Sequence, residues 1–88
     1  MKVNGMEYME IGSVVKVQKP YFQGVIIARV HRYSERGYPI LKVIYAEKED
    51  GGPQLNLIGK YIVVPALECE LFTGDVEQVE ARVAFHML

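Results

Sequence analysis

The stretch from residue 24 to residue 47 constrains the fold more than any other part of this 88-residue chain. It reads GVIIARVHRYSERGYPILKVIYAE, with β-branched and aromatic residues on two arms and polar residues 34–37 between them. Serine, charged residues and glycine supply the chemistry of a tight turn. The pattern therefore predicts a long β-hairpin and, with it, a mainly β fold.

Both faces of this hairpin are partly apolar. On the first arm, one face carries Ile26, Ala28 and Val30, and the other carries Val25, Ile27, Arg29, His31 and Tyr33. On the second arm, Leu41, Val43 and Tyr45 alternate with Ile40, Lys42 and Ile44. A sheet with one buried face shows cleaner alternation, so the second face is expected to contact another subunit. The expected interface consists of Val25, Ile27, Ile40 and Ile44.

The rest of the chain adds short strands around the hairpin. Residues 13–18, SVVKVQ, predict a first strand, and the loop 47–53, EKEDGGP, separates the hairpin from an apolar stretch at 61–64. Residues 65–68 form an expected turn before a short strand at 69–72. This order predicts a small SH3-like barrel over residues 11–74, preceded by an N-terminal arm at 1–10.

The C-terminal extension, residues 75–88, fits two structures. Five apolar residues alternate with five mostly polar ones from 78 to 87, which favours an extra strand. Val76, Val79, Val83 and Met87 also fit one helical stripe, and Asp75 with Gln78 resembles an N-capping pair. We expect the strand, with a short helix as the alternative.

Composition excludes several classes of protein. The net charge of −1, from 10 basic and 11 acidic residues, gives no overall attraction to nucleic acid or anionic membranes, so such binding requires a local patch. The single cysteine, Cys69, cannot form an internal disulfide and favours a reducing cytoplasm. No apolar run is long enough for a signal sequence or a membrane span, so no membrane association is expected.

Several residues between positions 12 and 68 match a known family. The segments IGSVVKVQKPYFQGVII, RGYPI and YIVVPALE resemble the small plasmid-encoded type II dihydrofolate reductases. The matching positions are Gly12, Lys16, Phe22, Gln23, Gly24, Gly37, Tyr38, Pro65, Leu67 and Glu68. The resemblance implies an SH3-like barrel, a tetramer with a central pore, reduction of dihydrofolate by NADPH and an origin on a mobile element.

The residues that bind ligands in that family are mostly replaced here. Lys16 matches the family's pore lysine, but Ile62, Val63 and Val64 stand where the reductases have a Gln-Ile-Tyr run. An apolar run offers no donors or acceptors for cofactor and folate. The resemblance thus favours the barrel over the reductase activity, and a divergent reductase, which would bind NADPH as a tetramer, stays an alternative.

Basic and aromatic residues gather near the hairpin tip and the first strands. Cations can neutralise phosphate or carboxylate while aromatic rings stack on bases or proline rings. The candidate ligand-binding residues are Lys16, Tyr21, Arg29, His31, Arg32, Tyr33, Arg36 and Tyr38. Such a patch predicts binding of single-stranded nucleic acid or a peptide.

Apart from the resemblance to the reductases, no motif in the sequence predicts catalysis or a bound cofactor. The two histidines, His31 and His86, lack the spacing of a metal site, and no phosphate-binding glycine motif is present. The sequence therefore predicts a non-enzymatic binding or assembly module, homo-oligomeric through its second hairpin face, with the basic-aromatic patch as an alternative site.

Overall fold

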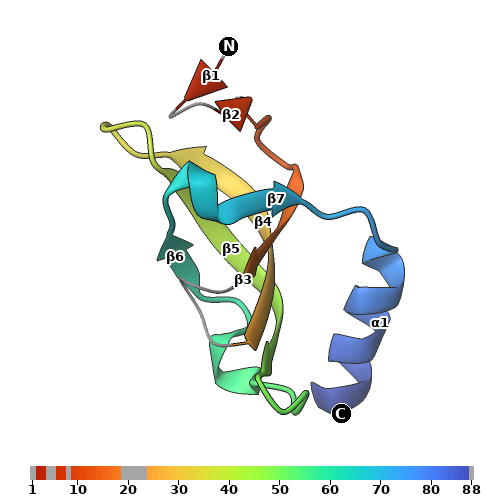
Figure 1. Cartoon of the computed structure of the whole chain (residues 1–88). Helices are drawn as coiled ribbons and strands as arrows, with labels where there is room; N and C mark the ends of the chain where they lie inside the picture. Colours follow the sequence, from red (N-terminus) through yellow and green to blue (C-terminus); the bar gives the residue numbers. More distant parts are fainter. Residues whose placement is uncertain (1, 4–5, 8, 19–23, 88) are drawn as a thin grey trace.

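A computed structural model describes residues 2–3, 6–7, 9–18 and 24–87. Its elements are β1 (Lys2–Val3), β2 (Met6–Glu7), β3 (Val14–Gln18), β4 (Gly24–Tyr33), β5 (Pro39–Lys48), the 3₁₀ turn η1 (Leu55–Leu57), β6 (Tyr61–Val63), the 3₁₀ turn η2 (Ala66–Glu68), β7 (Cys69–Leu71) and α1 (Val76–Met87). Among these residues, five antiparallel strands form one sheet in the order β6-β5-β4-β3-β7, and β1 pairs with β2 separately (Figure 1). The mainly β expectation is confirmed.

The long hairpin is the pair β4–β5, as the sequence predicts. Its turn is closed by backbone hydrogen bonds from Gly37 to Ser34 (2.9 Å) and from Ser34 to Tyr38 (2.8 Å). The Ser34 hydroxyl also accepts a hydrogen bond from the Tyr38 amide at 3.1 Å. Gly37 has φ 85°, a left-handed conformation that glycine adopts without steric cost. The turn residues therefore fix the register of the two arms.

A β-bulge in β5 changes which residues face the core. Ile27 pairs with Tyr45 and Ala28 pairs with Val43, so Ile44 is an extra residue without a partner in the ladder. Beyond the bulge, Ala46 belongs to the core cluster and Tyr45 points to the opposite face. The expectation that Tyr45 shares a face with Leu41 and Val43 was wrong, because strict alternation assumes an unbroken pleat.

A second irregularity lies at His31 on β4. Val30 pairs with Leu41 and Arg32 pairs with Ile40, which leaves His31 as the extra residue. Tyr33 is thereby shifted to the core side, where it packs against the core cluster and its hydroxyl donates a hydrogen bond to the Met9 carbonyl oxygen. The sequence placed Tyr33 with Arg29 and His31, and the bulge corrects that assignment.

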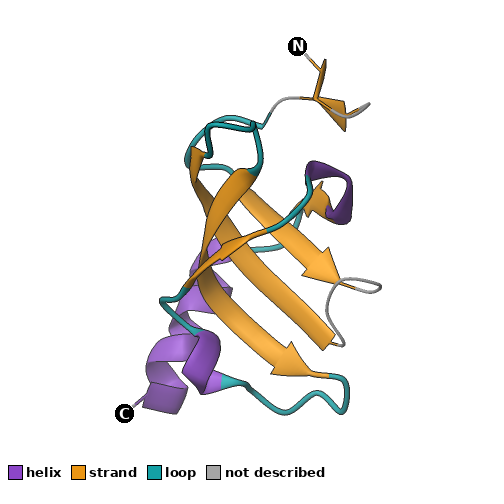
Figure 2. Ribbon diagram, turned by 90° about the vertical axis from the view of Figure 1, so that its left-hand side faces the viewer, coloured by secondary structure: helices purple, strands orange, loops and turns teal. Residues whose placement is uncertain are grey.

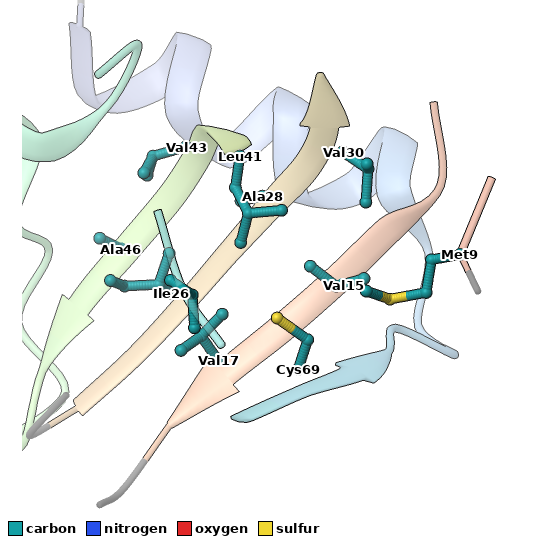
Figure 3. Packing of buried hydrophobic residues seen from close by; sticks show 11 residues of the cluster. Met9, Val15, Val17, Ile26, Ala28, Val30, Leu41, Val43, Ala46 and Cys69 are labelled. Atoms are coloured by element: carbon teal, nitrogen blue, oxygen red, sulfur yellow. The ribbon is translucent and has the colours of Figure 1, made fainter. Parts of the chain in front are cut away.

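The core lies on the concave side of the sheet, where residues of the central strands pack against Met9, Val64 and Cys69. Figure 3 shows side chains from β3, β4 and β5 meeting there, together with Cys69 and Met9. Leu57, Ile62 and Tyr33 pack around this cluster. The buried cluster consists of Met9, Val15, Val17, Ile26, Ala28, Val30, Leu41, Val43, Ala46, Val64 and Cys69.

The sheet is strongly twisted but remains open. Within the described residues, β6 pairs with β5 and β7 pairs with β3, and no ladder joins β6 to β7 (Figure 2). The turn η2 carries the chain from one edge to the other. The expected closure into a barrel is therefore not seen, although the strands follow the expected sequence of elements.

The C-terminal segment is a helix, so the expected extra strand was wrong and the alternative is confirmed. Asp75 caps the helix, because its carboxylate accepts a hydrogen bond from the Gln78 amide at 3.2 Å. Val76, Val79 and Val83 are half-buried while their neighbours are exposed, as a helical stripe requires.

Helix α1 lies against β5 on the face opposite the core (Figure 1). The Arg82 guanidinium lies 5.9 Å from the centroid of the Tyr45 ring. Tyr45 and its ladder partner Ile27 are nearly buried, with 5% and 6% of their surfaces exposed. Part of the apolar second face of the hairpin is thus covered by the chain's own helix. No helix among the described residues is long and apolar enough to span a bilayer.

Candidate binding groove

Three residues from three neighbouring strands form a row across the face opposite the core. Arg29 of β4 is directly opposite Lys42 of β5, and Lys42 is directly opposite Tyr61 of β6. Residues paired in this way have Cβ atoms about 4.5–5.5 Å apart. We call Arg29, Lys42 and Tyr61 the cross-strand row. It places two cations beside one aromatic ring.

The Arg29–Lys42 pair is unfavourable for folding. Like charges that face each other across a ladder destabilise a sheet. An anion bound between the two side chains would remove this repulsion, so the pair is a candidate anion site.

The bulge residue His31 extends the row. Its ring centroid lies 5.0 Å from that of Tyr61, at an interplanar angle of 58°. The Lys42 ammonium lies 6.0 Å from the Tyr61 centroid, at the limit of a cation–π contact. Tyr61 remains 55% exposed despite these neighbours. The ring is therefore held in place while much of its surface is open to a ligand.

An open groove of about 400 Å³ runs over this face. One wall is the Ile11–Gly12 segment, which the Arg29 guanidinium holds through a 3.2 Å hydrogen bond to the Gly12 carbonyl oxygen. Helix α1 contributes Glu80 to the lining. The lining residues are Ile11, Gly12, Arg29, Val30, His31, Lys42, Ile44 and Glu80.

A smaller hollow of about 200 Å³ adjoins the groove at His31. It is lined by His31, Arg32, Ile40 and Tyr61. Because His31 lines both, the groove and the hollow form one continuous surface. Among the described residues that line it, the charged side chains are Arg29, Arg32 and Lys42 against the carboxylate of Glu80. The surface thus combines a local excess of positive charge with an exposed aromatic ring.

The structure brings together part of the predicted ligand-binding set. Arg29, His31 and Arg32 line the groove and the hollow. Lys16 lies on β3 opposite Ile27 and Glu70, away from the lining residues. Of the remaining predicted residues, Arg36 and Tyr38 lie in or beside the hairpin turn, Tyr33 lies on the core side, and Tyr21 is outside the described residues.

Sequence reasoning misses three polar or aromatic residues of this surface, namely Lys42, Tyr61 and Glu80. Lys42 could not have been placed from the turn alone, because the bulge at His31 shifts the register and brings Lys42 opposite Arg29. Tyr61 and Glu80 gave no signal, since their positions depend on how β6 and α1 pack against the hairpin.

The predicted interface residues do not form one open patch. Ile27 is buried, whereas Val25, Ile40 and Ile44 are half-buried. Ile40 lines the hollow and Ile44 lines the groove. The helix and the groove account for much of the apolar pattern that suggested a subunit contact, and self-association through these residues stays a prediction.

The described residues give little support for a metal site or for a reactive cysteine. No group of three His, Cys, Asp or Glu side chains there is arranged to hold a metal ion. Burial raises the pKa of the Cys69 thiol to about 11, and the nearby Glu68 adds to this shift. The thiol is therefore protonated at neutral pH and is a poor nucleophile. Burial also raises the pKa of Tyr45, whose hydroxyl donates a 2.9 Å hydrogen bond to Glu47.

The positions that correspond to the reductases' ligand-binding run have mainly structural roles. Ile62 packs against the core cluster and Val64 is fully buried. Val63 is 49% exposed and lies opposite Ile40. Comparison of the chain with models of protein families, with curated proteins and with solved structures finds no match.

Proposed function

We propose that this protein is a non-enzymatic binding module that holds an anionic ligand in the groove beside α1. The observation that carries the proposal is the Arg29–Lys42 pair, two like charges directly opposite each other in the ladder. This arrangement costs folding free energy, and a bound anion would offset that cost. The strand order and the η2 turn also support an SH3-like arrangement, a small fold that binds ligands on its surface.

A polyanion without rings tests the anion site alone. We expect tripolyphosphate, titrated at low salt, to shift the backbone amide NMR signals of Arg29, Lys42 and their neighbours. Lys42→Gln should weaken this binding several-fold, because one of the two facing cations is lost. Lys60→Gln removes the same charge from an exposed lysine outside the lining residues and should leave the affinity unchanged.

Two results would contradict the anion site. One is the absence of localised shifts at low salt, where exposed charges interact most strongly. The other is an equal loss of affinity in Lys42→Gln and Lys60→Gln, which would indicate a diffuse response to net charge.

A second candidate function is self-assembly, which exposed apolar side chains favour. Tyr61 and Val63 on β6 are 55% and 49% exposed, and Leu67 on η2 and Leu71 on β7 are 62% and 61% exposed. Large apolar side chains that remain exposed favour contact with another chain. We expect a mass above that of the monomer in light scattering at about 100 μM, where a micromolar dimer is largely assembled. A strictly monomeric mass there would refute this candidate.

A further inference from the structure

We infer that the ligand of the groove is single-stranded nucleic acid, with a phosphate between Arg29 and Lys42 and a base on the Tyr61 ring. This inference rests on the proposed function, since it names the anion that the groove binds. A single strand repeats two groups, a charged phosphate and a flat base, and the cross-strand row offers a partner for each. Arg29 and Tyr61 are separated by two strand spacings, so their Cα atoms lie about 10 Å apart on one continuous surface.

The Tyr61 ring has the environment of a stacking platform. His31 packs against it at a tilt, and Ile40 also lines the adjoining hollow. A base on Tyr61 would therefore contact an aromatic ring and an aliphatic side chain together. Stacking of this kind tolerates any base, because every base has a flat aromatic face.

Three cations lie around that platform at different positions. Lys42 is 6.0 Å from the ring centroid, Arg32 lines the hollow, and Arg29 lies one strand beyond Lys42. Cations spaced around an aromatic ring suit a chain of phosphates better than a single small anion. Since the whole chain has a net charge of −1, binding must depend on these local charges and be sensitive to salt.

The shape of the surface favours a single strand over a duplex. The groove is lined by the Ile11–Gly12 segment and by Glu80 of α1, and Tyr61 lines the hollow that shares His31 with it. In a duplex the base faces are stacked and hidden, so Tyr61 could not contact them. An acidic peptide would satisfy the cations but lacks a repeated planar group for the Tyr61 ring.

The experiment is a fluorescence anisotropy titration of the full chain with a labelled oligothymidylate over a range of salt concentrations. The logarithm of the association constant should fall with the logarithm of salt at a slope of about −2, that is 0.7 for each of the three cations, Arg29, Lys42 and Arg32, that contact phosphate. Lys42→Gln should make this slope smaller by about 0.7, and Lys60→Gln should not change it.

Aromatic variants test the stacking contact. Tyr61→Ser should weaken binding by about tenfold, because the stacked base loses its platform. Tyr61→Phe keeps the ring and should bind as the original chain does. Phe85→Ser removes another exposed aromatic ring, on α1 and outside the residues that line the groove and the hollow, and should have no effect. Thermal unfolding of each variant shows whether the fold is retained.

The outcomes separate this inference from the proposed function. Binding of tripolyphosphate without binding of oligothymidylate would overturn the nucleic-acid assignment and leave the anion site standing. Equal affinity for a duplex or a polyglutamate peptide would also overturn it, and so would full binding by Tyr61→Ser. If neither tripolyphosphate nor the oligonucleotide binds, both proposals fail together.

Discussion

Replacing Leu41 by alanine is expected to lower the free energy of unfolding by about 2–5 kcal/mol. Leu41 is fully buried and lies on β5 between Val30 of β4 and Ile62 of β6. Its side chain therefore contacts the centre of the core, where the surrounding strands cannot collapse easily into the space it leaves. A domain of this size has about 4–13 kcal/mol of stability, so the change removes a large share.

Urea denaturation followed by circular dichroism measures this effect, and Leu67→Ala provides the matched control. Leu67 is 62% exposed on η2, and the same deletion there should cost much less. A similar loss of stability in the two variants would show that Leu41 is not in the interior of the sheet.

The predicted and the observed hairpin together show how far the sequence predicts this fold. The two arms, the polar turn and the charged loop after β5 were predicted correctly, because β-branched runs and turn residues are local signals. The bulges at Ile44 and His31 were not. A bulge exists only relative to the partner strand, so alternation within one strand cannot reveal it.

The prediction of an extra strand at the C-terminus was wrong for a different reason. Its valines fit both a period of two and a helical stripe, so periodicity alone could not decide. The Asp75 cap and the packing of α1 against β5 favour the helix, and the second of these is a tertiary contact. A long-range contact thus supports the helix in a segment whose local pattern was ambiguous.

The candidate site was predicted only in part, because sequence patterns show local clusters but not contacts between strands. Arg29, His31 and Arg32 lie close in sequence and on one strand, so a local cluster was visible. Lys42 and Tyr61 join them through ladder register across β5 and β6. A sheet builds its surface from residues far apart in the chain, and sequence patterns show only one strand of such a surface.

Replacing Val83 by aspartate is expected to detach α1 from the sheet and lower the free energy of unfolding by about 1–3 kcal/mol. Val83 is a half-buried residue of the stripe that faces β5, and Arg82 beside it covers the Tyr45 ring. A carboxylate on this stripe would have to remain hydrated, which docking of the helix prevents. Detachment exposes Ile27 and Tyr45, whose burial contributes the lost stability.

The matched control is Ala84→Asp, which adds the same charge at an exposed position of the same helix. If α1 docks through the Val83 stripe, urea unfolding will show a larger loss for Val83→Asp than for Ala84→Asp. Detachment also removes Glu80 from the groove, so tripolyphosphate should bind Val83→Asp more tightly than Ala84→Asp. Equal stability and equal affinity in the two variants would mean that the helix neither covers the second face nor supplies a competing carboxylate to the anion site.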